Sequence, residues 1–174
     1  GDYQDGFQQG LWTYYYPTGK IRAKGSYIDG DGEIQKTIRL NGYTNEILDD
    51  NDPGEGYVIT KRGNPIPKDG RDGKWIFYYE DGVIEEITNY SNGVLNGSSA
   101  FYSYDGSLRR KINYINNILE GPYIEGSGVM EEGTYKNGVK EGEFVRYTLN
   151  TNKQKVIVGK GFYKNGAIYD YKDL

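Results

Sequence analysis

The sequence predicts an all-β protein: an elongated, open antiparallel meander built from consecutive β-hairpin repeats. Glycines recur in a fixed phase, with Gly73 and Gly97 24 residues apart and Gly121 a further 24 residues along the chain. Short aromatic and β-branched runs, which are typical of strands, alternate with turn sequences that contain glycine. A fixed period of this size indicates a repeat architecture, in which each unit packs mainly on its neighbours.

Each repeat starts at a glycine and places aromatic residues and a second glycine at constant distances after it. The positions that follow this pattern are Gly10, Trp12, Tyr15, Gly19 and Tyr27; Gly73, Trp75, Tyr78, Gly82 and Tyr90; Gly97, Tyr102, Gly106 and Tyr114; and Gly142 and Tyr147. The last tyrosine of the later units falls out of phase, at Tyr135 and Tyr163. We assign the first displacement to a shortened hairpin tip and the second to a lengthened one, because hairpin tips tolerate such changes.

The unit at Gly73 shows how one repeat becomes a hairpin. Residues 74–79 form the first strand, Asp81-Gly82 is a hairpin turn signal, and residues 83–90 return. Trp75, Phe77 and Tyr79 share one face and Tyr78 points to the other, so both faces carry aromatic residues unless a β-bulge shifts the register. On the return strand, equal parity places Ile84 and Tyr90 on one face. Ser91-Asn92-Gly93 then turns the chain into the next unit.

Residues 31–72 break the rhythm, and we expect a divergent lateral insertion within a single domain spanning residues 1–174. It contains an acidic stretch at residues 46–55. Residues 49–56 offer oxygen ligands for calcium but lack the spacing of the helical calcium loop, so a solvated loop is the favoured interpretation. Residues 168–171 are predicted to form a last edge strand. Exposed edges can pair with another chain, so an edge-strand homodimer is one expectation.

The composition argues against an enzyme. The chain has no histidine and no cysteine, which removes the commonest general base and the thiolate ligands of zinc. The adjacent pairs Glu85-Glu86 and Glu131-Glu132 point to opposite faces of a strand, so neither pair can act on one substrate as joint acid and base. We therefore expect no catalytic residue, cofactor or metal site. The net charge of −4, without a basic block, argues against nucleic-acid binding and membrane contact.

The chain starts with Gly1 in the middle of a repeat. Two explanations stay open: removal of an export signal, or a cut between domains. The first slightly favours an exported or cell-envelope location, and the cytoplasm is the alternative.

The run from Gly73 to Ile84, followed by Tyr90-Ser-Asn-Gly-Val-Leu-Asn-Gly97, resembles the MORN repeat. It is most similar to the bacterial variant found in YwqK-type antitoxins, and the resemblance covers residues 3–30 and 73–166. This resemblance implies an elongated, curved or twisted sheet of MORN-like hairpins and a mostly non-catalytic role in scaffolding, partner binding or lipid contact. The antitoxin variant implies pairing with a toxin.

The repeated tyrosines form two series with two interpretations. Either they make an exposed strip for a peptide, glycan or lipid, or they pack on the next hairpin; their internal recurrence favours packing. The series are Tyr15, Tyr78, Tyr102 and Tyr147, and Tyr27, Tyr90, Tyr114, Tyr135 and Tyr163. Our leading hypothesis is a non-enzymatic protein–protein interaction module. The alternatives are an antitoxin or immunity protein that neutralises a cognate toxin, and a lipid- or glycan-binding surface protein.

Overall fold

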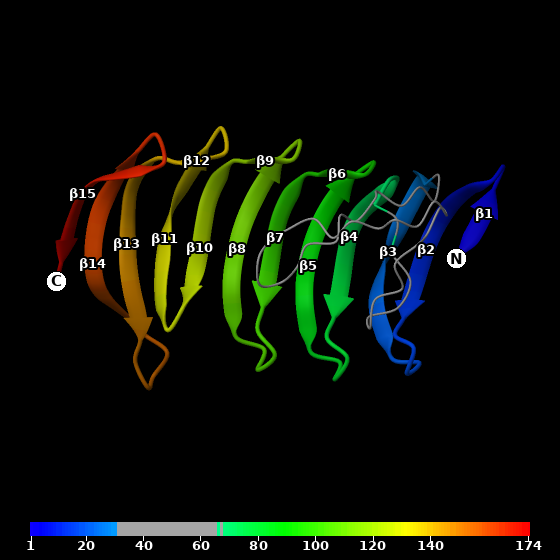
Figure 1. The fold of residues 1–174 in the computed structure, drawn as a ribbon, viewed down its shortest axis with the longest axis horizontal. Coiled ribbons are helices and arrows are strands. Elements are labelled where there is room, and N and C mark those ends of the chain that lie inside the picture. The colour runs from blue at the N-terminus through cyan, green and yellow to red at the C-terminus, as the bar shows by residue number, and fades with distance from the viewer. Residues whose placement is uncertain (31–65, 67) are drawn as a thin grey trace, which may run out of the picture.

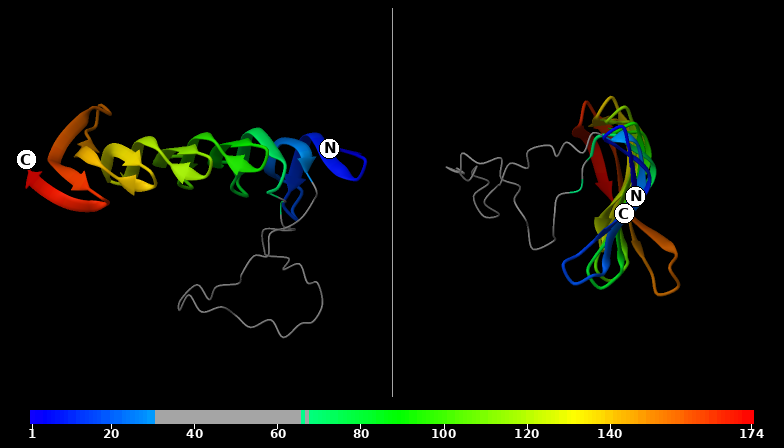
Figure 2. Two further views of the ribbon diagram at one scale, coloured as in Figure 1. Left: turned by 90° about the horizontal axis from the view of Figure 1, so that it is seen from above. Right: turned by 90° about the vertical axis from the view of Figure 1, so that its right-hand side faces the viewer.

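The fold is one open antiparallel sheet, seen in a computed structural model that describes residues 1–30, 66 and 68–174 (Figure 1). These residues form fifteen strands and no helix, and the sheet does not close, so the predicted all-β meander is confirmed. Figure 2 shows that the sheet is long, narrow and bent. Most of the predicted insertion at residues 31–72, including its acidic stretch, lies outside the described residues.

The strands follow one another along the sheet almost in chain order. They are β1 (Asp2–Gln4), β2 (Phe7–Tyr15), β3 (Ile21–Gly30), β4 (Arg71–Tyr78), β5 (Ile84–Ser91), β6 (Val94–Leu95), β7 (Gly97–Tyr102), β8 (Leu108–Ile115), β9 (Ile118–Leu119), β10 (Gly121–Ser127), β11 (Val129–Lys136), β12 (Val139–Lys140), β13 (Gly142–Leu149), β14 (Lys155–Lys164) and β15 (Ala167–Asp173). The two-residue strands β6, β9 and β12 pair with β5, β8 and β11.

Strands β3 and β4 are direct neighbours although residues 31–70 separate them in the sequence. Ala23 lies opposite Phe77, and Tyr27 lies opposite Arg71. The interruption therefore enters between two paired strands without breaking the sheet. At the C-terminal end, the predicted edge strand is confirmed as β15, whose described strand neighbour is β14.

Four hairpin tips are short turns beside a β-bulge, in β2–β3, β4–β5, β7–β8 and β13–β14, whereas the β10–β11 pairing has no register shift. In the β4–β5 hairpin, Tyr79 donates its amide to Val83 at 2.8 Å, and Gly82 has a φ of 94°, which glycine adopts without steric cost. The register then shifts, because Phe77 lies opposite Glu86 and Tyr78 lies opposite Ile84. Glu85 is therefore the extra residue, and Ile84 shares a face with Tyr78. The prediction that Ile84 shares a face with Tyr90 was wrong, since the bulge reverses the alternation.

The connectors between hairpins stack on one another through backbone hydrogen bonds. Each turn has two residues with positive φ, as type I′ turns require, for example Asn92 at 45° and Gly93 at 78°. An amide of each turn donates to a carbonyl in the preceding connector: Gly93 to Arg71 (2.7 Å), Asn117 to Leu95 (2.9 Å), Gly138 to Leu119 (2.9 Å) and Gly166 to Lys140 (3.0 Å). This ladder links every unit from β4 onward to the next.

The buried side chains gather on one face of the sheet, which carries Trp75, Ser99, Tyr123 and Phe144 and which we call the aromatic face. Large rings alternate there with small residues on the neighbouring strands. Trp75 is fully buried, and a Cβ added at Gly25 would lie 2.2 Å from its ring. Glycine at position 25 thus leaves the space in which the indole of the next hairpin lies.

Candidate functional site

The second tyrosine series lies on the aromatic face near the connectors. Tyr27, Tyr90, Tyr135 and Tyr163 are buried, and Tyr114 is half-buried. Tyr27 meets the Trp75 indole edge-on, with the ring centroids 5.0 Å apart. These rings pack against neighbouring hairpins rather than form an exposed strip.

The first tyrosine series lies on the opposite face, and its members are not equivalent. Tyr15 is 57% exposed, Tyr78 and Tyr102 are half-buried, and Tyr147 is buried. The expectation that every member packs on the next hairpin was wrong for Tyr15. The repeat glycines of the pattern all have positive φ, namely Gly10, Gly19, Gly73, Gly82, Gly97, Gly106 and Gly142, and Trp12 is half-buried against the Tyr27 ring.

Two tyrosines that the sequence pattern did not single out hold the hairpin tips together. Tyr16 and Tyr79, each 6% exposed, directly follow Tyr15 and Tyr78. The hydroxyl of Tyr16 donates to the carbonyl of Tyr78 at 2.6 Å, and that of Tyr79 donates to the carbonyl of Tyr102 at 2.8 Å. The doubled tyrosine before each of these tips was the available signal.

At the N-terminal side of the aromatic face, the buried guanidinium of Arg71 lies among aromatic rings. Its Cζ is 4.7 Å from the centroid of Trp75 and 5.3 Å from those of Phe77 and Tyr90. Nη1 donates to the Tyr90 hydroxyl at 3.0 Å, and Nη2 donates to the Ile66 carbonyl at 2.9 Å. Burial raises the pKa of Tyr90, although Arg71 opposes the rise, so this hydroxyl stays neutral.

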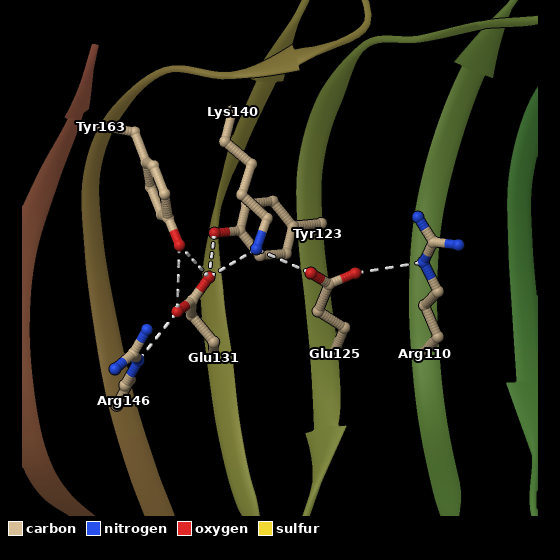
Figure 3. Close-up of polar contacts among 7 residues, drawn as sticks. All are labelled: Arg110, Tyr123, Glu125, Glu131, Lys140, Arg146 and Tyr163. Atoms are coloured by element: carbon tan, nitrogen blue, oxygen red, sulfur yellow. Dashed lines mark hydrogen bonds and ion pairs between the residues drawn. The ribbon is translucent and has the colours of Figure 1, made fainter. Parts of the chain in front are cut away.

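At the C-terminal side, the carboxylate of Glu131 is the centre of a polar network (Figure 3). It accepts hydrogen bonds from the Tyr123 hydroxyl at 2.7 Å, Lys140 Nζ at 2.7 Å, Arg146 Nε at 2.9 Å and the Tyr163 hydroxyl at 3.1 Å. Burial would raise the pKa of Glu131, but the bonds from Lys140, Tyr123 and Arg146 outweigh it and lower the pKa to about 2. Glu131 is therefore ionised at neutral pH.

The same network continues through Glu125 toward the middle of the sheet. Lys140 Nζ lies 2.7 Å from a Glu125 oxygen, and Arg110 Nε lies 3.1 Å from the other. Together these side chains connect β8, β10, β11, β12, β13 and β14. Glu131 and its neighbour Glu132 point to opposite faces, as strand geometry predicts, and Glu132 pairs instead with Lys155. The network therefore links the strands of this part of the sheet through the two oxygens of Glu131.

A row of cross-strand partners joins the two clusters across the aromatic face. In strand order it consists of Phe77, Glu86, Phe101, Arg110, Glu125, Glu131 and Arg146. Phe77, Glu86 and Phe101 are all half-buried, and we call these three residues the central stripe. Burial raises the pKa of Glu86 to about 7, although Arg71 acts against the rise. None of the residues that the structure describes hydrogen-bonds to this carboxylate or forms an ion pair with it.

A family model described as a MORN repeat variant matches residues 8–29 and 71–92. The matched segments are the hairpins β2–β3 and β4–β5, which flank the interruption. MORN repeats are in general protein- or membrane-binding repeat modules, and the match does not distinguish the antitoxin variant. No curated protein shows significant similarity to the chain. In the part of the chain that the structure covers, no helix is long and apolar enough to cross a membrane.

Proposed function

We propose that this chain is a non-enzymatic protein-interaction module that binds its partner along the aromatic face, over the central stripe. The observation that carries the proposal is the row from Phe77 to Arg146. It places half-buried aromatic and charged side chains side by side across one face of an open sheet. Aromatic residues and arginine are the side chains enriched in the cores of protein interfaces.

The polar clusters of this face support binding rather than catalysis. Every oxygen of Glu131 already accepts hydrogen bonds, and its low pKa leaves it without a proton to transfer at neutral pH. The hydroxyls of Thr88 and Ser99 hydrogen-bond to each other, and both residues are 1% exposed. A substrate could not reach these hydroxyls without opening the sheet.

Affinity capture with matched variants tests the proposal. The immobilised protein is expected to retain a partner from a lysate of the source cells, and the double variant F77A/F101A is expected to lose it. The control, I76A/I87A, removes two half-buried side chains from the opposite face at neighbouring positions and should retain the partner. Circular dichroism establishes that both variants fold.

Equal capture by both double variants would refute the aromatic face as the binding surface. A captured protein that arrests growth when expressed alone, with growth restored by this chain, would identify the partner as a toxin. Turnover of a captured small molecule would contradict the non-enzymatic assignment.

A further inference from the structure

We propose that the central stripe is a recognition site for one cationic side chain, a lysine or arginine, of the partner protein. The carboxylate of Glu86 would receive the charge, and the rings of Phe77 and Phe101 would flank it. This inference rests on the proposed function and names the chemical group that the partner presents.

The geometry of three adjacent strands forms the site. Glu86 of β5 lies directly opposite Phe77 of β4 on one side and opposite Phe101 of β7 on the other. Cross-strand partners of this kind have Cβ atoms about 5 Å apart, so each ring lies within reach of a group bound at the carboxylate. All three side chains keep part of their surface exposed on the aromatic face.

Glu86 differs from the other carboxylates of the row in having no ionic partner among the described residues. Glu125 pairs with Arg110 and Lys140, and Glu131 pairs with Lys140 and Arg146. Arg71 is near Glu86, but its guanidinium donates to Tyr90 and Ile66 and lies against three rings. Glu86 is therefore the carboxylate of this row that forms no ion pair with any residue in the described part of the fold.

A cation satisfies this site better than a neutral or anionic group. A carboxylate that is covered by a partner without a counter-charge is destabilised, whereas a partner ammonium or guanidinium compensates it. Phenyl faces attract cations, and the alkyl stem of lysine or arginine can lie along the rings. A net charge of −4 also disfavours an anionic partner.

The charged and titratable groups that act on Glu86 define how binding depends on pH. Arg71 of β4 and Lys68 favour its ionised form, whereas Glu85 opposes it. The phenols of Tyr90 and Tyr114 face it as neutral groups, because burial raises the pKa of each. With a pKa of about 7, Glu86 must release its proton before it pairs with a cation. Affinity for a cation should therefore rise with pH, by about tenfold between pH 6 and pH 8.

NMR titration of the intact protein with N-acetyl-lysine amide tests the site, and N-acetyl-norleucine amide serves as the neutral control of the same shape. Saturating amide shifts are expected at residues 77, 86 and 101 with the lysine compound alone, and affinity should be about tenfold higher at pH 8 than at pH 6. The variant E86Q should bind at least about tenfold more weakly at pH 8. At that pH Glu86 is already ionised, so E85Q, which removes the same charge one residue away, should bind like the wild type.

Equal shifts with norleucine amide, or unchanged lysine binding in E86Q, would overturn the cation site. If E86Q still captured the partner of the wild type while F77A/F101A did not, the cation site would fall but the proposed binding face would stand. Loss of capture in both variants, with capture retained by E85Q, would support both.

Discussion

Replacing Glu131 by glutamine should destabilise the protein strongly at neutral pH and only weakly in acid. The substitution keeps the shape of the side chain and removes the charge that Lys140 and Arg146 contact at 2.7 Å and 2.9 Å. Lys140 retains Glu125, but Arg146 loses its one carboxylate contact among the ion pairs of the described residues. The energetic effect should therefore follow the ionisation of Glu131.

The magnitude follows from the pKa of this carboxyl group. Its value in the fold is about 2, against an ordinary 4.5. Since each pKa unit is worth about 1.4 kcal/mol, the charged network contributes about 3 kcal/mol to the free energy of unfolding. A lowered pKa gives stability that is fully present above pH 4.5 and is lost as the pH falls toward 2. We expect E131Q to be less stable than the wild type by about 3 kcal/mol at pH 7 and by about 1 kcal/mol at pH 3.

Urea denaturation followed by tryptophan fluorescence and circular dichroism at pH 7, 4.5 and 3 measures this difference. The matched control is E132Q, one residue along β11 on the opposite face, where the Lys155 pair is more exposed. That control should cost less than about 1 kcal/mol, as surface ion pairs do. A loss in E131Q that stayed the same from pH 7 to pH 3, or one no larger than that of E132Q, would refute the role of the buried charge.

Three further substitutions test other features of the fold. Gly25→Ala places a methyl group where the Trp75 ring lies, and overpacking of this kind should lower the free energy of unfolding, measured by urea titration, by about 1–3 kcal/mol. An unchanged free energy of unfolding would mean that the Trp75 ring does not contact residue 25. Tyr79→Phe removes one hydrogen bond to the Tyr102 carbonyl and should lower the stability by about 1 kcal/mol, with an unchanged result excluding the tip-to-tip contact. The raised pKa of Glu86 stabilises the fold only while the carboxyl group is protonated, so the stability of the wild type should fall as the pH rises from 4.5 through 7. Thermal melts of E86Q should show no such fall, and parallel pH profiles of the two proteins would contradict this prediction.

The hairpins could be predicted because their signals are local. An Asp-Gly or Asn-Gly step, an alternating run and a phased glycine each act within a few residues, and β4–β5 follows them closely. The shortened tip was correct, since β10 and β11 are joined through Gly128 alone. The lengthened tip was wrong, since residues 150–154 form a turn as long as residues 79–83 between β4 and β5, and the extra residues instead extend the paired strands β13 and β14 up to Leu149 and Lys155. The single-domain organisation and the edge-strand homodimer stay predictions.

The candidate site could be predicted only in part, because it depends on register. The buried tyrosines near the connectors follow the repeat phase, but one extra residue at Glu85 reverses the faces of the tip residues. That bulge places Ile84 on the face of Tyr78 rather than on that of Tyr90. The spacing of residues in the sequence does not predict this register shift, because the shift arises from the pairing of two strands.

Local chemistry alone determined that the chain forms stacked hairpins, since turn preference and strand alternation depend on neighbours in sequence. Only the tertiary structure decided which charges meet. Glu131 gains four donors from β10, β12, β13 and β14, whereas Glu86, in the same cross-strand row, lies between two phenyl rings. The environment of a side chain in a sheet is set by the strands beside it, and their alignment is a property of the whole array.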